Sequence, residues 1–65
     1  MSEFEPVAVT VLKETEKAFQ LRDKDEMGPD AWFPKSQISF ERRNIKTGDA
    51  IAEIPNWLLK EKGWL

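Results

Sequence analysis

The chain has 65 residues, with no cysteine and no histidine, so it has room for one domain and can form neither disulfide bonds nor thiolate or imidazole metal sites. Its 10 basic and 12 acidic residues give a net charge of −2, which argues against the basic surface that is typical of nucleic-acid-binding domains. We expect one small domain over residues 1–65, stabilised by an aromatic-rich core or by association with a partner, with a few aromatic side chains exposed at the interface in the second case.

The first part of the chain predicts two strands joined by a hairpin. The segment FEPVAVTVLKE alternates valines with other residues, which indicates a strand with the valines on one face. Pro6 cannot donate a ladder hydrogen bond, so we expect this strand to begin at a sheet edge or outside the sheet. The segment TEKAFQLRD alternates again, with Phe19 and Leu21 on one side, and the polar connection KETEK suits a hairpin.

The middle of the chain predicts a loop and a corner. The segment DKDEMGPD is the strongest loop signal, because it combines acidic residues with glycine and proline. In AWFPKSQISF we expect a short strand that Pro34 ends, a polar corner, and a new strand. That new strand, ISFERRN, should carry Phe40 and Arg42 on one face and Arg43 on the other. KTGD then predicts a turn, and AIAEI predicts the last strand.

The C-terminal segment IPNWLLKEKGWL predicts a short helix over about residues 55–62. Pro55 suits the first helical position, and Gly63 suits the left-handed residue that ends a helix. With that ending, Trp64 should pack on Leu59. Four to five short antiparallel strands with one terminal helix predict a mainly β fold, either a small SH3-like or OB-like barrel or a strongly bent sheet.

The sequence offers little for catalysis. Without histidine or cysteine, the commonest general base and the thiol nucleophile are missing, and Ser36 has only Lys35 beside it, on the opposite face of an extended chain. Glu14 and Glu16 are best interpreted as charges on a solvated turn. We therefore expect a protein that is not an enzyme and that needs no cofactor.

The acidic loop invites comparison with a calcium-binding loop. Asp23, Asp25 and Gly28 occupy positions one, three and six of that pattern, but Met27 and Pro34 stand where oxygen ligands are required at positions five and twelve. We therefore expect a solvated hairpin loop and no metal site.

Two surfaces are candidates for binding. Small barrels bind single-stranded nucleic acid by stacking bases on exposed aromatics beside a basic groove. The residues that could form such a surface are Trp32, Phe33, Lys35, Phe40, Arg42 and Arg43. The alternative, which the acidic composition favours, is that the aromatics fill the core and the basic residues solubilise the surface. At the other end of the chain, Trp64 and Leu65 either cover the core or meet a partner protein.

Residues 32–38 (WFPKSQI) and 54–63 (IPNWLLKEKG) resemble segments of small proteins found in phage and prophage genomes. With residues 17–21 the resemblance covers about three-quarters of the chain, and Phe33 departs from it where an aliphatic residue is more usual. The resemblance brings no catalytic residue. It implies an accessory role, because such proteins are short reading frames among early or replication and recombination genes.

Together these observations favour an accessory protein that docks on a host or viral protein as an adaptor or inhibitor. The alternative is a single-stranded nucleic-acid-binding module of a replication or recombination system. The small core also makes a homodimer a reasonable expectation. The N-terminus lacks the apolar region of a signal peptide, and no apolar run approaches membrane-spanning length. We expect a cytoplasmic protein, in the host cytoplasm if it is viral.

Overall fold

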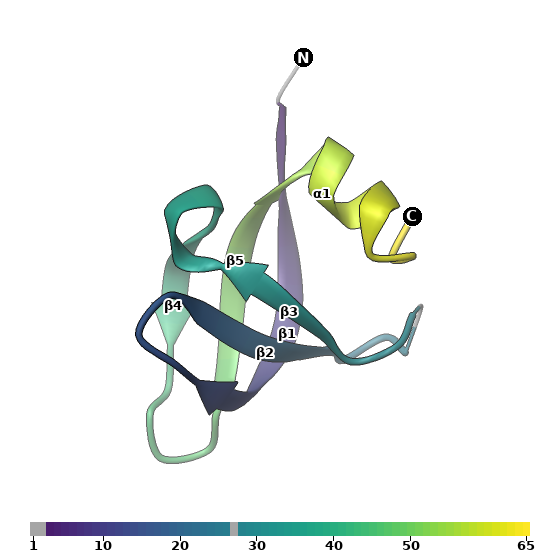
Figure 1. Ribbon diagram of the computed structural model, residues 1–65. Coiled ribbons are helices and arrows are strands. Elements are labelled where there is room, and N and C mark those ends of the chain that lie inside the picture. The colour runs from purple at the N-terminus through teal and green to yellow at the C-terminus, as the bar shows by residue number, and fades with distance from the viewer. Residues whose placement is uncertain (1–2, 27) are drawn as a thin grey trace.

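The computed structural model describes residues 3–26 and 28–65. Within these ranges the chain forms one five-stranded antiparallel sheet and a short terminal helix (Figure 1). The elements are β1 (Phe4–Glu14), β2 (Ala18–Asp23), β3 (Ala31–Pro34), the 3-10 helix η1 (Lys35–Gln37), β4 (Ser39–Arg43), β5 (Asp49–Pro55) and α1 (Asn56–Glu61). The strand order is β3-β2-β1-β5-β4. The predicted mainly β fold is confirmed as a bent sheet, in which β3 and β4 are the two edges.

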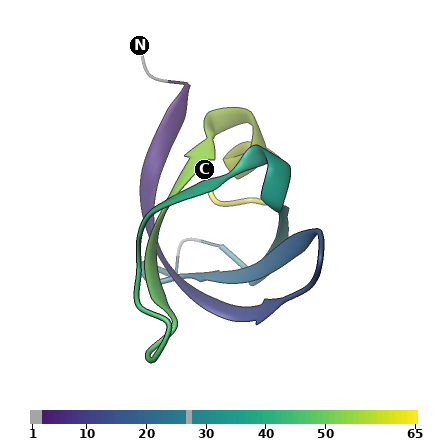
Figure 2. The same ribbon diagram turned by 90° about the vertical axis from the view of Figure 1, so that its left-hand side faces the viewer.

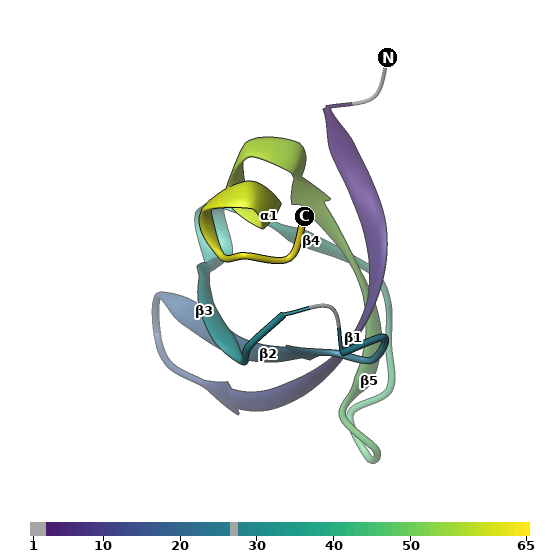
Figure 3. The ribbon, with the colours of Figure 1, turned by 90° about the vertical axis from the view of Figure 1, so that its right-hand side faces the viewer.

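The central strand β1 is long enough to serve two neighbours in turn. Its first part, from Phe4 to Thr10, pairs with β5, and its last part, from Val9 to Glu14, pairs with β2. The strands curl around a shared interior, and α1 lies over one end of it (Figures 2 and 3). Because β2 ends at Asp23, opposite Val9, residues 5–8 of β1 have a paired strand on the β5 side alone.

Pro6 lies on the unpaired side of this segment. The carbonyl of Ala8 points away from β5 and accepts a hydrogen bond from the Lys24 N–H at 3.1 Å. Backbone directions alternate along a strand, so position 6 faces the same way as position 8. The missing N–H of Pro6 is therefore directed at the open edge, where it leaves no ladder bond unmade. The prediction that this strand begins at a sheet edge is confirmed.

The inward faces of the strands and helix meet in one core. Val9, Leu21, Phe33 and Ile54 have no exposed surface. Around them pack Phe19, Ile38, Ala50, Ala52, Leu58, Leu59 and Trp64. The valines of β1 share the inner face as predicted, with Val7 and Val11 partly buried against the core.

The helix ends as the sequence predicts but begins differently. Gly63 has φ 78, the Trp64 N–H donates to the Leu59 carbonyl at 2.8 Å, and the Gly63 N–H donates to the Lys60 carbonyl at 3.2 Å. These two bonds are the Schellman arrangement, and they direct Trp64 back into the core. Pro55, however, is the last residue of β5 and caps the helix in an extended conformation, so it is not the first helical residue.

Two β-bulges change which face the strand ends present. Leu12 is the extra residue in β1, between the pairs formed by Val11 and Lys13, and Glu41 is the extra residue in β4, between Phe40 and Arg42. A shift of one residue moves every later side chain to the other face. The prediction that Arg43 faces away from Phe40 is therefore wrong.

The segment AWFPKSQISF forms the predicted corner. Pro34 closes β3 opposite Ala18, and η1 then turns the chain toward β4. The Lys35 N–H donates to the Lys17 carbonyl at 2.8 Å, which ties the corner to the β1–β2 hairpin.

Candidate functional site

Two of the residues suggested by the sequence as binding residues are part of the core. Phe33 is 0% exposed and Trp64 is 4% exposed. Their rings meet edge to face with 4.9 Å between centroids. Phe33 therefore cannot stack with a base in this fold, and Trp64 covers the core at the end of the chain.

Three others, Lys35, Phe40 and Arg43, meet at the C-terminal end of β1, beside Glu14. We call this group, with Glu14 and Phe19, the Glu14 cluster. Glu14 binds both cations: its carboxylate accepts from the Lys35 Nζ at 2.7 Å and from an Arg43 Nη at 3.0 Å. The bulge at Leu12 brings Glu14 to the inner face, where it pairs across the ladder with Phe19.

The aromatic rings form the base of the Glu14 cluster. Phe19 and Phe40 pack edge to face with 4.9 Å between centroids. The Lys35 Nζ lies 4.8 Å from the Phe19 centroid, and the Arg43 guanidinium lies 5.1 and 5.2 Å from the Phe19 and Phe40 centroids. Cations over ring faces are attracted by the ring quadrupole. The cluster therefore links β1, β4 and the corner after β3.

Both cations of the Glu14 cluster are bound to its one carboxylate. Hydrogen bonds from Lys35 and then Arg43 hold the pKa of the Glu14 carboxyl below its usual range. Because the two cations share this one carboxylate, the cluster keeps a net charge of only +1, which is a weak attraction for a polyanion. The cluster is best understood as a structural closure of this end of the sheet.

The remaining two predicted residues, Trp32 and Arg42, are exposed but far apart in the sheet order. Trp32 is 40% exposed on β3 and pairs with Gln20, whereas Arg42 lies on β4 and pairs with Ile51. A hollow of about 360 Å³ beside Arg42 also contains Lys24, but that lysine is bound to Asp49 at 2.8 Å. The structure thus does not bring the predicted aromatics and cations together into one basic groove.

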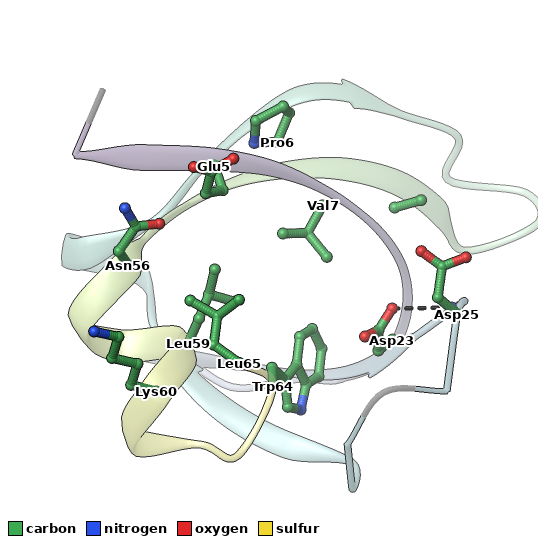
Figure 4. A pocket seen from close by; sticks show the side chains of 11 residues that line it. Glu5, Pro6, Val7, Asp23, Asp25, Asn56, Leu59, Lys60, Trp64 and Leu65 are labelled. Carbon is green, nitrogen blue, oxygen red and sulfur yellow. Dashed lines mark hydrogen bonds between the residues drawn. The ribbon is translucent and has the colours of Figure 1, made fainter. Parts of the chain in front are cut away.

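A cavity of about 450 Å³ opens at the opposite end of β1 (Figure 4). Its size is within the range of about 300–1,000 Å³ that is usual for ligand sites. We call it the acidic groove; its lining residues are Glu5, Pro6, Val7, Ala8, Asp23, Asp25, Asn56, Leu59, Lys60, Trp64 and Leu65. One wall is the stretch of β1 that pairs with β5 alone, and the other is α1 with the C-terminal residues.

The wall that Trp64 forms is held in place by the β2–β3 loop. The indole Nε1–H of Trp64 donates to the Pro29 carbonyl at 2.7 Å. A Cβ added to Gly28 would lie 2.6 Å from the Gly63 carbonyl oxygen and 2.6 Å from Trp64 Cδ1, so only glycine fits there without a shift. The loop and the C-terminus therefore form one unit on this side of the groove.

The polar side chains of the groove are three carboxylates, the amide of Asn56 and the amino group of Lys60. Asp23 is 4% exposed, and its Oδ1 accepts the Asp25 N–H at 2.9 Å. Within the described residues, neither Asp23, Asp25 nor Glu5 takes part in an ion pair, and the buried Oδ1 of Asn56 has no hydrogen-bond partner. The amino group of Lys60 points away from the cavity (Figure 4).

The sequence pointed to Asp23 and Asp25 for calcium only, and it missed this groove. No group of acidic side chains in residues 3–26 and 28–65 is arranged to hold a metal ion, and Met27 lies outside the described residues. A usable signal was present, because Asp23 follows Phe19 and Leu21 in the inward phase of β2. A carboxylate at an inward position of a strand predicts a buried charge, which is costly to keep and therefore marks a candidate binding site.

No protein-family model, curated protein or solved structure matches this chain. Of the helices in the described part of the chain, none has the length and hydropathy needed to cross a bilayer.

Proposed function

We propose that this chain is a non-enzymatic accessory protein that docks on another protein, as an adaptor or inhibitor, through the acidic groove. The observation that carries this proposal is the groove itself: a cavity of about 450 Å³ that combines apolar walls with acidic groups that form no ion pair in the described residues. The resemblance to small phage and prophage proteins supports an accessory role by association alone.

The groove suits the side chains of a partner better than an added strand. Strand addition needs a row of N–H and C=O groups on the open edge. Along residues 5–8 that row is broken, because Pro6 has no N–H and the Ala8 carbonyl already accepts from Lys24. Recognition should therefore depend on what enters the cavity between Val7, Leu59 and Trp64.

Catalysis is not needed to explain the groove. Its titratable groups are carboxylates and one lysine, whose amino group points outward. Covalent catalysis requires a nucleophile beside a base, and the described lining residues contain no such pair. A binding role accounts for the observed groups with fewer assumptions.

Site-specific photo-crosslinking tests this proposal. Leu65 lines the groove and is 68% exposed, so a photoreactive phenylalanine analogue placed there should leave the fold intact. In the native host, we expect position 65 to form a defined adduct with a partner protein, identified by mass spectrometry. Excess unlabelled wild-type protein should compete the adduct away.

A matched control uses Ile45, which is 84% exposed in the β4–β5 turn and does not line the groove. The same analogue at position 45 should not trap that partner. Adducts that form from position 45 and not from position 65 would place the docking surface elsewhere and contradict the proposal.

A further inference from the structure

Resting on the proposed function, we infer that the acidic groove receives an arginine side chain of the partner protein, bound between the carboxylates of Asp23 and Asp25. The groove lacks a cation for its carboxylates among the described residues, and this indicates the chemistry of the ligand. In the described residues the groove's carboxylates pair with no cation and the buried Asn56 Oδ1 has no donor, so a group that donates hydrogen bonds and carries positive charge complements the groove.

Asp23 is the strongest part of the evidence. It is more than nine-tenths buried, yet one donor alone, the Asp25 N–H on Oδ1, reaches it among the described residues. A buried carboxylate is costly unless it is paired and hydrogen-bonded. Asp23 and Asp25 both line the cavity: the Asp23 oxygen on the Asp25 side accepts the Asp25 N–H, and the second oxygen accepts no hydrogen bond from the described residues (Figure 4).

Asn56 gives a second, independent observation at the other end of the groove. Its Oδ1 is buried and has no hydrogen-bond partner, although buried polar groups are paired in the large majority of cases. Glu5 lies next to it in the lining (Figure 4). In the described residues, each end of the groove thus has an acceptor that no cation or side-chain donor reaches, so a segment that carries donors fits its whole length.

The apolar surface between these ends selects the type of cation. Val7, Leu59 and Trp64 line the middle of the cavity, where a chain of methylene groups can lie while its charged end reaches the carboxylates. Guanidinium has five donors in a planar fork that matches two carboxylates, is more weakly hydrated than ammonium, and stacks on aromatic surfaces. These properties favour arginine over lysine.

Peptide binding tests the inference with a change of one functional group. A dye-labelled heptapeptide with one central arginine among serines is titrated with the protein and followed by fluorescence anisotropy. Two matched peptides carry citrulline, which keeps the shape without the charge, or lysine. We expect the citrulline peptide to bind at least about tenfold more weakly, as expected for loss of a charged hydrogen bond, with lysine between them.

Variants then locate the site. Asp25→Asn keeps the backbone N–H that Asp23 accepts, and it should reduce binding of the arginine peptide to the level of the citrulline peptide. Glu5→Gln should have a smaller effect, because it lies at the other end. Asp30→Asn is the control: Asp30 is bound to Arg22 at 3.0 Å and lies outside the lining, so binding should not change.

Failure of this inference can be told apart from failure of docking. Equal affinity for the arginine and citrulline peptides, no binding of the arginine peptide, or an Asp25→Asn variant that binds normally would each overturn the arginine site. If position 65 still traps a partner, docking at the groove stands and only its specificity is wrong. If position 65 traps nothing while the arginine peptide binds as expected, the arginine site stands and the docking role is wrong.

Discussion

The two ends of β1 differ in how the carboxylates on the inner face of the sheet are paired. At one end, Glu14 accepts from Lys35 at 2.7 Å and from Arg43 at 3.0 Å above two packed aromatic rings. At the other, Asp23, Asp25 and Glu5 line a cavity without any ion pair in the described residues. One end carries its own cations, and the other end is arranged for a cation from outside.

This difference distinguishes charges that stabilise the fold, in the Glu14 cluster, from charges that we propose bind a partner, in the acidic groove. A charge cluster whose members pair with one another stabilises the fold and offers a partner little. Carboxylates that pair with no cation in the described residues contribute no such attraction and repel one another, so their presence in so small a domain needs another explanation. Perturbing each end in turn should therefore change different properties of the protein.

The largest effect is expected from Trp64→Ala, which removes a wall of the acidic groove and a part of the core. Trp64 is 4% exposed, packs on Phe33 and donates to Pro29, so the variant should lose about 3–5 kcal/mol of unfolding free energy. Urea denaturation followed by circular dichroism measures this loss. Trp57→Ala is the control, since Trp57 is 56% exposed and its removal should change stability by no more than about 0.5 kcal/mol. Similar losses in both variants would contradict the assigned packing.

A smaller loss is expected from Gly28→Ala, which disturbs the groove wall without removing a core side chain. The added Cβ would lie 2.6 Å from both the Gly63 carbonyl oxygen and Trp64 Cδ1, so the C-terminal segment must move, at a cost of about 1–3 kcal/mol. Thermal denaturation measures this cost, and the NMR indole signal of Trp64 should shift. The indole signals of Trp32 and Trp57 serve as internal controls. An unchanged Trp64 signal would show that the loop and C-terminus are not coupled.

Glu14→Gln should change the pH dependence of stability, because it removes the carboxylate of the Glu14 cluster. The pKa of Glu14 is lowered in the folded chain by Lys35 and Arg43, so its contribution is present above the ordinary carboxyl pKa of 4.5 and is lost as the pH falls through the lowered value. The variant should be less stable than wild type at pH 7, and the gap should close in strong acid. Urea denaturation at both pH values tests this, and a gap that persists in strong acid would contradict the account.

Neutralising carboxylates of the acidic groove should have the smallest effect on stability. The double variant Glu5→Gln with Asp25→Asn removes charges that no cation pairs in the described structure, so unfolding free energy at pH 7 should stay within about 0.5 kcal/mol of wild type or rise slightly. Denaturation beside Glu14→Gln makes the comparison direct. A loss as large as that of Glu14→Gln would mean that the groove acids are structural.

Local sequence patterns predicted much of the fold, but they did not predict the Glu14 cluster or the acidic groove. The alternating valines of β1, the corner at Pro34 and the Gly63 ending each depend on neighbouring residues, so the sequence predicted them. The Glu14 cluster depends on bulges at Leu12 and Glu41, and a bulge in one strand is defined by the register of its partner. Simple alternation therefore placed Arg43 on the wrong face and gave no reason to join Glu14 to it.

The acidic groove was hidden for a related reason. It exists because β2 stops at Asp23 while β1 continues past it, and because the Schellman ending returns Trp64 toward the loop at Pro29. Neither the unequal strand lengths nor the contact between positions 29 and 64 can be read from local spacing. The inward phase of Asp23 on β2 was the single local signal for it.

The most direct test of the contrast between the two ends is an NMR titration of isotope-labelled protein with the arginine heptapeptide. Both ends are observed in one experiment, through the Trp64 indole and the Asp23 and Asp25 amides on one side and the Arg43 side chain on the other. We predict progressive shifts of the groove signals while the Arg43 signals and the indoles of Trp32 and Trp57 remain in place. Shifts confined to the Arg43 end, with an unmoved Trp64 indole, would contradict the account.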